Sequence, residues 1–245
     1  MTASPHTLAQ RGKSYWAESR RPLVSLVFTA PLLLIYEAAV LLLGQAALRN
    51  GAEAWLRQLL DALGFSQYFL LPLLTVCILL GWHHLTHEPW RVSLGVLYAM
   101  AGECVALALC LRLFLRIQGI LLATAVAPAP LSIAGTAGTL AGYLGAGIYE
   151  ELLFRLILLS LGIGLLRWLR AGPRWSTLGG IVLTSFLFAM AHYIGPYGDA
   201  FRWFTFLFRF LAGGFFSVLF LYRGFGIAAG THAGYDVLVG LSLGI

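Results

Sequence analysis

Charged residues are scarce in this sequence, and their scarcity excludes an ordinary soluble domain. They make up 11% of the 245 residues, whereas about 25% is usual in soluble proteins. Hydrophobic residues make up 60%, and a mean hydropathy of +0.84 means that most of the surface must contact something other than water. Because one span needs about 20 apolar residues, we predict an all-α fold, a polytopic transmembrane helix bundle of about seven or eight spans.

Cysteine and lysine are also rare. Cys77, Cys104 and Cys110 fall in apolar segments, and no pair has the spacing of a metal site or a disulfide framework. Only one of the 16 basic residues is lysine, and the arginines lie mainly in short stretches between apolar runs. That pattern is typical of topology signals and of contact with anionic lipid. We therefore expect the lipid bilayer and a membrane-bound protein or peptide as partners, and no nucleic acid.

The apolar runs divide the chain into three regions. Residues 1–22 form a polar tail, residues 23–140 hold the first membrane spans, and residues 141–245 form a second membrane region. Residues 53–65 have apolar positions at helical spacing with charges opposite, which predicts an interfacial helix. The composition of residues 119–140 is compatible with a span, a re-entrant segment or a surface segment. We expect spans over residues 23–44, 68–82, 92–115, 141–169, 176–194, 203–222 and 225–243.

Several charged side chains lie inside these predicted spans. A charge at the bilayer centre costs about 2.5–3.5 kcal/mol or more, so each must face the bundle interior and be paired or neutralised. Glu37 and Glu103 stand alone in their spans, and we predict structural roles for them. Arg209 is expected to neutralise one of the acids. The remaining charges gather in three motifs.

The first motif is Glu150-Glu151-Leu-Leu-Phe-Arg155. Glu151 and Arg155 are four residues apart on a helix, so they share a face and can form an ion pair. Glu150 is rotated from Glu151 by about 100°. The pattern therefore predicts that Arg155 supports Glu151 structurally, whereas Glu150 faces a cavity.

The second and third motifs each carry a histidine. Phe188 precedes His192 by one helical turn, so its ring is expected to pack beside the imidazole and support it. Asp236 follows His232 by one turn and can orient the ring or share its proton. Gly234 between them is expected to let another backbone come close. We take the ionisable residues of the three motifs to form one catalytic site, since such residues in membranes are usually functional.

This set of groups suits hydrolysis of an amide bond. A buried carboxylate such as Glu150 beside His192 can take a proton from water. A second histidine, His232 held by Asp236, can donate to the developing oxyanion. Zinc or another divalent metal held by Glu150, His192 and His232 is an alternative, because two histidines and a glutamate are an accepted catalytic ligand set.

The motifs resemble those of the CPBP family, the CAAX prenyl protease 2 type proteins, also called Abi or bacteriocin-processing intramembrane proteases. They stand in the family's order on separate apolar segments, as Glu150-Glu151-x-x-x-Arg155, Phe188-x-x-x-His192 and His232-x-x-x-Asp236. The resemblance covers about residues 141–240, which makes residues 141–245 the CPBP-type catalytic membrane core.

The resemblance implies an intramembrane endopeptidase. It assigns water activation to Glu150 and His192, and oxyanion stabilisation to His232 and the residue four positions later. That residue is Asp236 here and asparagine in the best-known prenyl proteases. The implied substrate is membrane-bound, and the resemblance leaves the need for a metal open.

Two other classes of protein would also keep charges inside a membrane. A non-catalytic scaffold or immunity protein would bind another membrane protein and retain the motifs for stability, so its function would survive the loss of Glu150. A proton-coupled transporter would show two related halves with broken helices, and the sequence shows no such symmetry. The short loops and Arg-rich segment ends are typical of a bacterial protein, so we expect a multi-pass protein of the bacterial inner membrane.

Overall fold

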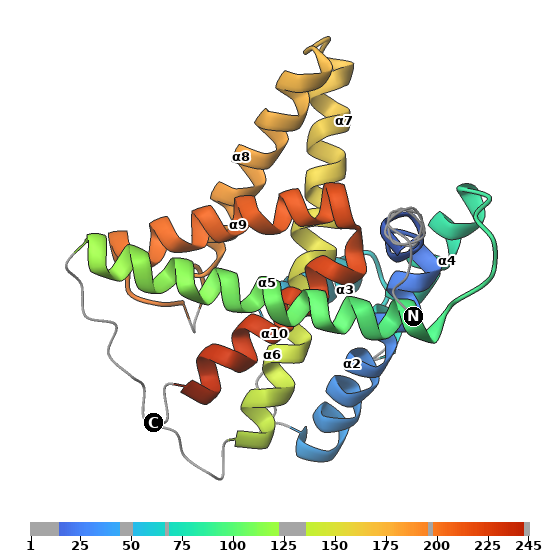
Figure 1. Cartoon of the computed structure of the whole chain (residues 1–245), viewed down its shortest axis with the longest axis horizontal. Coiled ribbons are helices and arrows are strands. Elements are labelled where there is room, and N and C mark those ends of the chain that lie inside the picture. The colour runs from blue at the N-terminus through green and yellow to red at the C-terminus, as the bar shows by residue number, and fades with distance from the viewer. Residues whose placement is uncertain (1–14, 45–50, 67–68, 123–135, 196–197, 243–245) are drawn as a thin grey trace, which may run out of the picture.

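All regular structure in the described part of the chain is helical. The computed structural model describes residues 15–44, 51–66, 69–122, 136–195 and 198–242 (Figure 1). Within these ranges the all-α prediction is confirmed. The helices are α2 (Pro22–Leu43), α3 (Gly51–Ala62), α4 (Leu70–Leu85), α5 (Leu94–Leu121), α6 (Thr136–Glu151), the π-helical run η3 (Leu152–Leu159), α7 (Ser160–Trp168), α8 (Pro173–Ala191), α9 (Trp203–Arg223) and α10 (Phe225–Ser242).

Four of the described helices, α2, α5, α8 and α9, are long and apolar enough to cross a membrane. α4 is a shorter apolar helix. A helix is present over the range predicted to be interfacial, as α3, and its position at the interface stays a prediction. The chain is thus an integral membrane protein, but the count of seven or eight spans is not confirmed by these helices. The undecided range 119–140 lies mostly outside the described residues.

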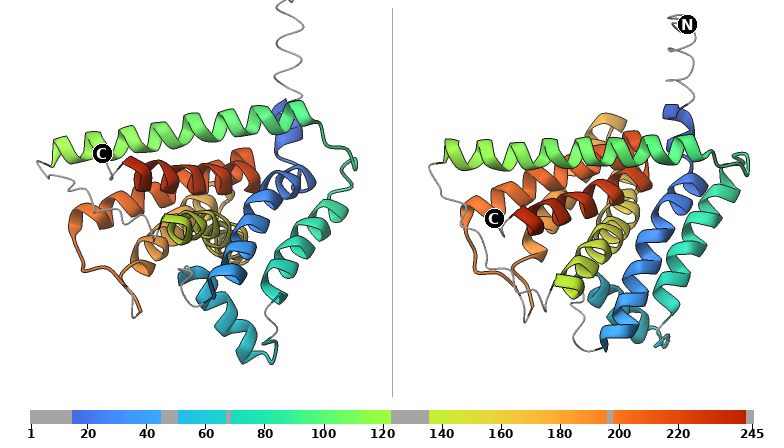
Figure 2. Two further views of the ribbon diagram at one scale, coloured as in Figure 1. Left: turned by 90° about the horizontal axis from the view of Figure 1, so that it is seen from below. Right: turned by 60° about the horizontal axis from the view of Figure 1, so that its bottom comes forward.

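α10 runs through the centre of the bundle. It lies beside α5 (Figure 2) and also contacts α6, α9 and α2. A Cβ on Gly230 would lie 2.7 Å from a ring carbon of Phe28 and 2.8 Å from Cys104 Sγ, so only glycine fits there. Such small residues let membrane helices approach closely. The prediction of a close approach at Gly234 is wrong, because a Cβ there would meet only Ala108 at the ordinary distance of 3.7 Å.

The helix that carries the first motif is continuous from α6 through η3 into α7 (Figure 1). Its middle part has π-helical hydrogen bonding, which is rare and frequently marks functional sites. Gly147 of α6 faces α10, since a Cβ on it would lie 2.6 Å from the backbone nitrogen and the Cβ of Ala233. This close contact brings the end of α6 against the part of α10 that carries the third motif.

α7 and α8 form a hairpin that projects from the rest of the protein (Figure 1). A Cβ on Gly180 would lie 2.7 Å from Ile163 Cγ1, so glycine lets the two helices pack closely. Arg170, two residues after the end of α7, has the left-handed conformation (φ 63°), and the next N–H, of Ala171, donates to the Leu166 carbonyl at 2.9 Å. A residue with a Cβ pays about 1–2 kcal/mol for this conformation, where glycine is the usual choice.

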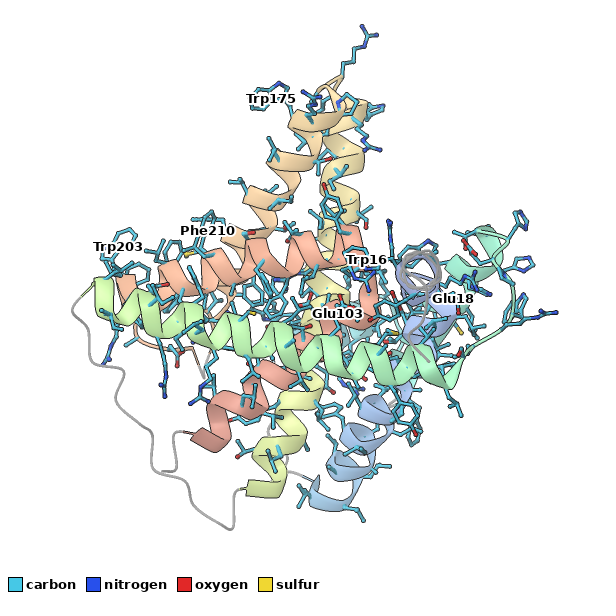
Figure 3. The ribbon with its side chains drawn as sticks, viewed as in Figure 1. Trp16, Glu18, Glu103, Trp175, Trp203 and Phe210 are labelled. Carbon is cyan, nitrogen blue, oxygen red and sulfur yellow. The ribbon has the colours of Figure 1, made fainter. Side chains whose placement is uncertain are left out.

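The junction of α9 and α10 is tied to the amino-terminal residues. Arg223 donates two hydrogen bonds of 2.7 Å to Glu103 of α5, and its guanidinium carbon lies 4.0 Å from the centre of the Trp16 ring. Tyr15 also donates to Glu103. Burial, together with the hydrogen bond to Glu103 and its charge, raises the pKa of Tyr15. Figure 3 labels Glu103 and Trp16 in this region. Glu103 is therefore paired and structural.

α3 is held in place by buried tyrosine and carboxylate groups. Glu53 accepts a hydrogen bond from Arg57 Nε at 2.6 Å and another from the Tyr36 hydroxyl of α2. Glu37, also of α2, accepts a hydrogen bond of 2.5 Å from the Tyr149 hydroxyl of α6. All of these groups except Arg57 are buried. α3 is therefore fixed against α2 beside the end of α6, and Glu37 has the predicted structural role.

The contact at Gly147 predicts a position-specific response to a single methyl group. Gly147→Ala should lower the stability of the purified protein by about 1–3 kcal/mol, because it overpacks the contact between α6 and α10. Gly162→Ala is the matched control on the same continuous helix, since nothing lies within 4 Å of its Cβ position. The control should be neutral or slightly stabilising. Thermal unfolding in one detergent compares the two, and equal stability would contradict the contact.

Candidate active site

Glu150 and Glu151 end α6 and point to different partners. Glu151 is completely buried and forms an ion pair with Arg155, with 3.0 Å between Oε1 and Nη1. The ion pair predicted from the four-residue spacing is therefore present in the structure. Arg155 also donates to the Gly213 carbonyl of α9 at 3.3 Å, and only 1% of it is exposed. Arg155 thus joins the first motif to α9 as well as to Glu151.

Glu151 also fixes the ring of His232. Its Oε1 lies 2.7 Å from His232 Nδ1. Asp236, on the same helix as His232, is farther away, with its Oδ2 at 3.6 Å from Nε2. Glu151 therefore orients the imidazole directly. Sequence reasoning assigned this role to Asp236 and linked Glu151 with Arg155 alone.

The other ring nitrogen of His232 faces two carboxylates. Nε2 lies 3.7 Å from Glu150 Oε2 and 3.6 Å from Asp236 Oδ2. Three carboxylates thus surround one imidazole in a buried place. Arg155 is the permanent cation of this cluster.

Two phenylalanines enclose the histidines. Phe188 lies edge-on to His192, with 4.9 Å between ring centres, and edge-on to His232 at 5.9 Å. The Arg155 guanidinium carbon lies 4.3 Å from the centre of the Phe188 ring. Phe216 of α9 stacks on His232 at 4.5 Å. The predicted support from Phe188 is present, and Phe216 is a further contact that the motifs do not contain.

His192 has a defined donor and a defined acceptor nitrogen. Its Nδ1 lies 2.8 Å from the Phe188 carbonyl. A carbonyl oxygen can only accept, so Nδ1 carries the hydrogen of the neutral ring and Nε2 keeps a lone pair. The His192 carbonyl in turn accepts a hydrogen bond of 2.9 Å from the Asp199 N–H. His192 can therefore accept a proton from water at Nε2.

A cavity of about 490 Å³ opens beside Glu150 and His192. α3 forms one wall through Ala52, Trp55 and Gln58. His232 and Asp236 are not among the lining residues, and His232 Nε2 lies 3.7 Å from Glu150 Oε2. The structure thus brings Glu150 and His192 to one cavity. His232, which was expected at the same site, contacts Glu150 but does not line this cavity. The contribution of α3 has no signal in the three motifs.

An apolar cavity of about 320 Å³ adjoins the first. The two cavities share Trp55, Phe154, Ala191 and Ile194. The remaining lining of the apolar cavity is hydrophobic and comes from the same three parts of the fold, α3, η3 and α8. Polar and apolar binding space are therefore contiguous.

The described residues do not assemble a metal ligand shell. Within the ranges that the structure covers, no group of three histidine, cysteine, aspartate or glutamate side chains could hold a metal ion. Glu151 lies at His232 Nδ1 and the Phe188 carbonyl at His192 Nδ1, so a metal could reach these two rings only at Nε2. The described side chains as placed supply no three-ligand set, and metal binding by Glu150, His192 and His232 stays a prediction.

The other charges considered for the membrane interior lie outside this cluster. Arg209 pairs with Asp199, which belongs to the loop after α8 and lines the cavity. Its guanidinium lies 5.1 Å from the centre of the Tyr193 ring. Arg209 therefore neutralises an acid, as predicted, but the acid is in a loop and not in a span.

Arg155 should be required for folding. Arg155→Ala leaves Glu151 buried without its cation, and breaking a buried ion pair costs about 3–5 kcal/mol. We expect a lower yield of folded protein and a lower melting temperature. Arg167→Ala, at an exposed position of the same continuous helix, should change stability by less than about 0.5 kcal/mol. Normal yield and stability of Arg155→Ala would show that the pair is dispensable.

Comparison with known families supports an enzyme. Residues 132–238 match the family model described as type II CAAX prenyl endopeptidase Rce1-like. No curated protein and no solved structure matches the chain. The matched segment contains the whole Glu150, His192 and His232 cluster and agrees with the resemblance drawn from the motifs. Over residues 132–238 the chain is thus similar to Rce1-like type II CAAX prenyl endopeptidases, which is consistent with a protease of the CPBP family.

Proposed function

We propose that the protein is an intramembrane endopeptidase that hydrolyses a peptide bond with water activated by Glu150 and His192. The observation that carries this proposal is the placement of both side chains on one cavity, with His192 Nε2 able to accept a proton. A carboxylate and an imidazole at one cavity can position water and remove its proton as it attacks a carbonyl. The membrane protease family supplies the type of reaction.

His232 is proposed to stabilise the oxyanion. While Glu151 is ionised and paired with Arg155, it can only accept a hydrogen bond, so His232 Nδ1 must carry a hydrogen. A neutral imidazole has one N–H, so Nε2 also carries a hydrogen only when the ring is an imidazolium. The carboxylates of Glu150 and Asp236 beside Nε2 favour that charged form. A charged donor in a dry site is an effective partner for a developing negative charge.

The two adjoining cavities support a membrane-bound protein or peptide as the substrate. The reacting bond would lie in the polar cavity beside Glu150, and an apolar part of the substrate would occupy the hydrophobic cavity. Apolar walls with few polar groups are the usual composition of ligand sites. We propose the bacterial inner membrane as the location, a proposal that the short, Arg-rich loops support.

The scaffold alternative makes a different prediction from the enzyme for Glu150. Purified wild-type protein should cleave at least one component of the host membrane proteome, detected as a new peptide terminus by mass spectrometry. Glu150→Gln should reduce that cleavage by about 10²–10⁴-fold, as is usual when a general base is removed. Glu88→Gln, at a partly exposed residue that lines neither cavity, should leave the cleavage unchanged.

Folding and metal dependence are measured in the same assay. The Glu150→Gln protein should unfold at the wild-type temperature within a few degrees. Cleavage that survives in this variant would refute the enzyme proposal and favour a scaffold. Loss of wild-type cleavage with a chelator, and its recovery with zinc, would assign a metal-dependent mechanism in place of one that uses side chains alone.

Asp236 should tolerate asparagine but not alanine. Glu151 holds the His232 ring, and Glu150 is a second carboxylate near Nε2, so the charge of Asp236 is not the only support for an imidazolium. Asp236→Asn keeps a polar group of the same shape and should retain substantial cleavage. Asp236→Ala should lose most of it. If both variants were equally inactive on the identified substrate, the carboxylate itself would be needed, as a metal ligand or a proton acceptor.

A further inference from the structure

The end of the α7–α8 hairpin carries charge and aromatic rings that the proposed reaction does not use. We call residues Arg167, Trp168, Arg170, Arg174 and Trp175 the arginine–tryptophan tip. All five are exposed, the two tryptophans by 78% and 74%. The hairpin projects from the bundle (Figure 1), and Trp175 lies at its end (Figure 3).

The tip is positively charged without local compensation. No aspartate or glutamate occurs from residue 152 to residue 198, which includes both arms of the hairpin. Among the residues that the structure describes, none of the three tip arginines takes part in an ion pair. By contrast, Arg155, Arg209 and Arg223 all pair with a carboxylate. The tip is therefore open to an anion from outside the chain.

The sides of the hairpin indicate what surrounds it. Leu161 and Leu165 of α7, and Leu178 and Val182 of α8, are more than half exposed. Side chains of this kind on a projecting membrane hairpin must contact acyl chains. Tryptophan is enriched where acyl chains meet headgroups, because its ring is amphipathic. The sides of the hairpin are therefore apolar, and its end carries tryptophan and arginine. This order matches the order of a bilayer from acyl chains to headgroups.

The backbone of Arg170 provides an independent observation. Arg170 is one of two described residues other than glycine with a positive φ, and it lies two residues after the end of α7, where glycine would be unstrained. Strained positions of this kind cluster at functional sites. A charged side chain at this turn is consistent with a role outside folding.

From these observations we propose that the arginine–tryptophan tip binds the phosphate headgroups of anionic phospholipids at the membrane interface. Arginine forms paired hydrogen bonds with phosphate oxygens, and the flanking tryptophans place the tip at headgroup depth. This interaction is independent of the proposed peptidase reaction, so either can fail without the other.

The test uses full-length protein in neutral detergent at low ionic strength, with fluorescent short-chain phosphatidylglycerol and the phosphatidylcholine of the same chains as probes. Each arginine near an anionic headgroup raises the affinity for the anionic lipid by about fivefold. Wild-type protein should therefore prefer phosphatidylglycerol by about a hundredfold. Substitution of all three arginines by glutamine (R167Q, R170Q and R174Q together) should abolish the preference.

A control with the same change in charge tests whether position matters. Arg91, Arg116 and Arg202 are exposed at other places in the structure, and their combined change to glutamine should leave the preference within about fivefold of wild type. Equal loss in both triple variants would overturn the proposal, as would a wild-type protein without preference. Competition by 10 mM inorganic phosphate would assign the tip to free phosphate, and displacement by poly-glutamate would assign it to an acidic protein; both outcomes overturn the lipid assignment.

Arg170→Gly separates binding from folding. Removal of the strained side chain should raise the melting temperature in neutral detergent by roughly 2–4 °C, whereas affinity for phosphatidylglycerol should fall about fivefold. Opposite directions of these two changes support the proposal, and they cannot result from a general loss of folded protein. A variant that is more stable but binds phosphatidylglycerol as well as wild type would exclude Arg170 from the site.

Discussion

Glu151 is the group on which the rest of the buried polar cluster depends. Its fully buried carboxylate has one oxygen, Oε1, that lies 3.0 Å from Arg155 Nη1 and 2.7 Å from His232 Nδ1. Through Arg155 it is connected to Phe188 of α8 and to the Gly213 carbonyl of α9, and through His232 to α10. A buried charge is tolerated only when such partners replace the lost water. The relative positions of four parts of the fold therefore depend on the presence of an ionised carboxylate at this place.

Adjacent positions on α6 give two glutamates different environments. A step of about 100° between neighbours on a helix turns Glu151 into the protein and leaves Glu150 at the cavity. The next residues form the π-helical run η3, which contains Arg155. Since α6 packs on α10 through Gly147, the backbone that carries both glutamates is held close to the backbone that carries His232. Close packing of small residues is thus the reason that short polar contacts can form between these helices.

The sequence allowed prediction of the helical class and of the Glu151–Arg155 pair, because each depends on local spacing. The cluster members were predicted in another way, from the rule that ionisable residues inside membranes are usually functional and from the resemblance of the three motifs to a family. Contacts between distant segments were not predictable from local spacing. His232 and Glu151 are 81 positions apart, and helical periodicity says nothing about which helices adjoin. For the same reason the partner of Glu103 was not predicted: Arg223 falls just outside the predicted span of residues 203–222, whereas in the structure it ends α9 beside α5. The α3 wall of the cavity also depends on tertiary packing, through Glu53 and Tyr36.

The same helix connects the cluster with the arginine–tryptophan tip. Glu150 and Arg167 lie 17 positions apart on one continuous helical run, which corresponds to at most about 25 Å at 1.5 Å per residue. α8 returns over a similar length, from Arg174 to His192 at its carboxyl end. If the tip lies among headgroups, the backbone positions of Glu150 and His192 must lie within about 27 Å of that interface whatever the tilt of the hairpin, which is less than the ~30 Å thickness of the hydrocarbon core. Headgroup binding at the tip would then limit the depth at which a substrate meets Glu150, without any contact between the lipid and the catalytic cluster.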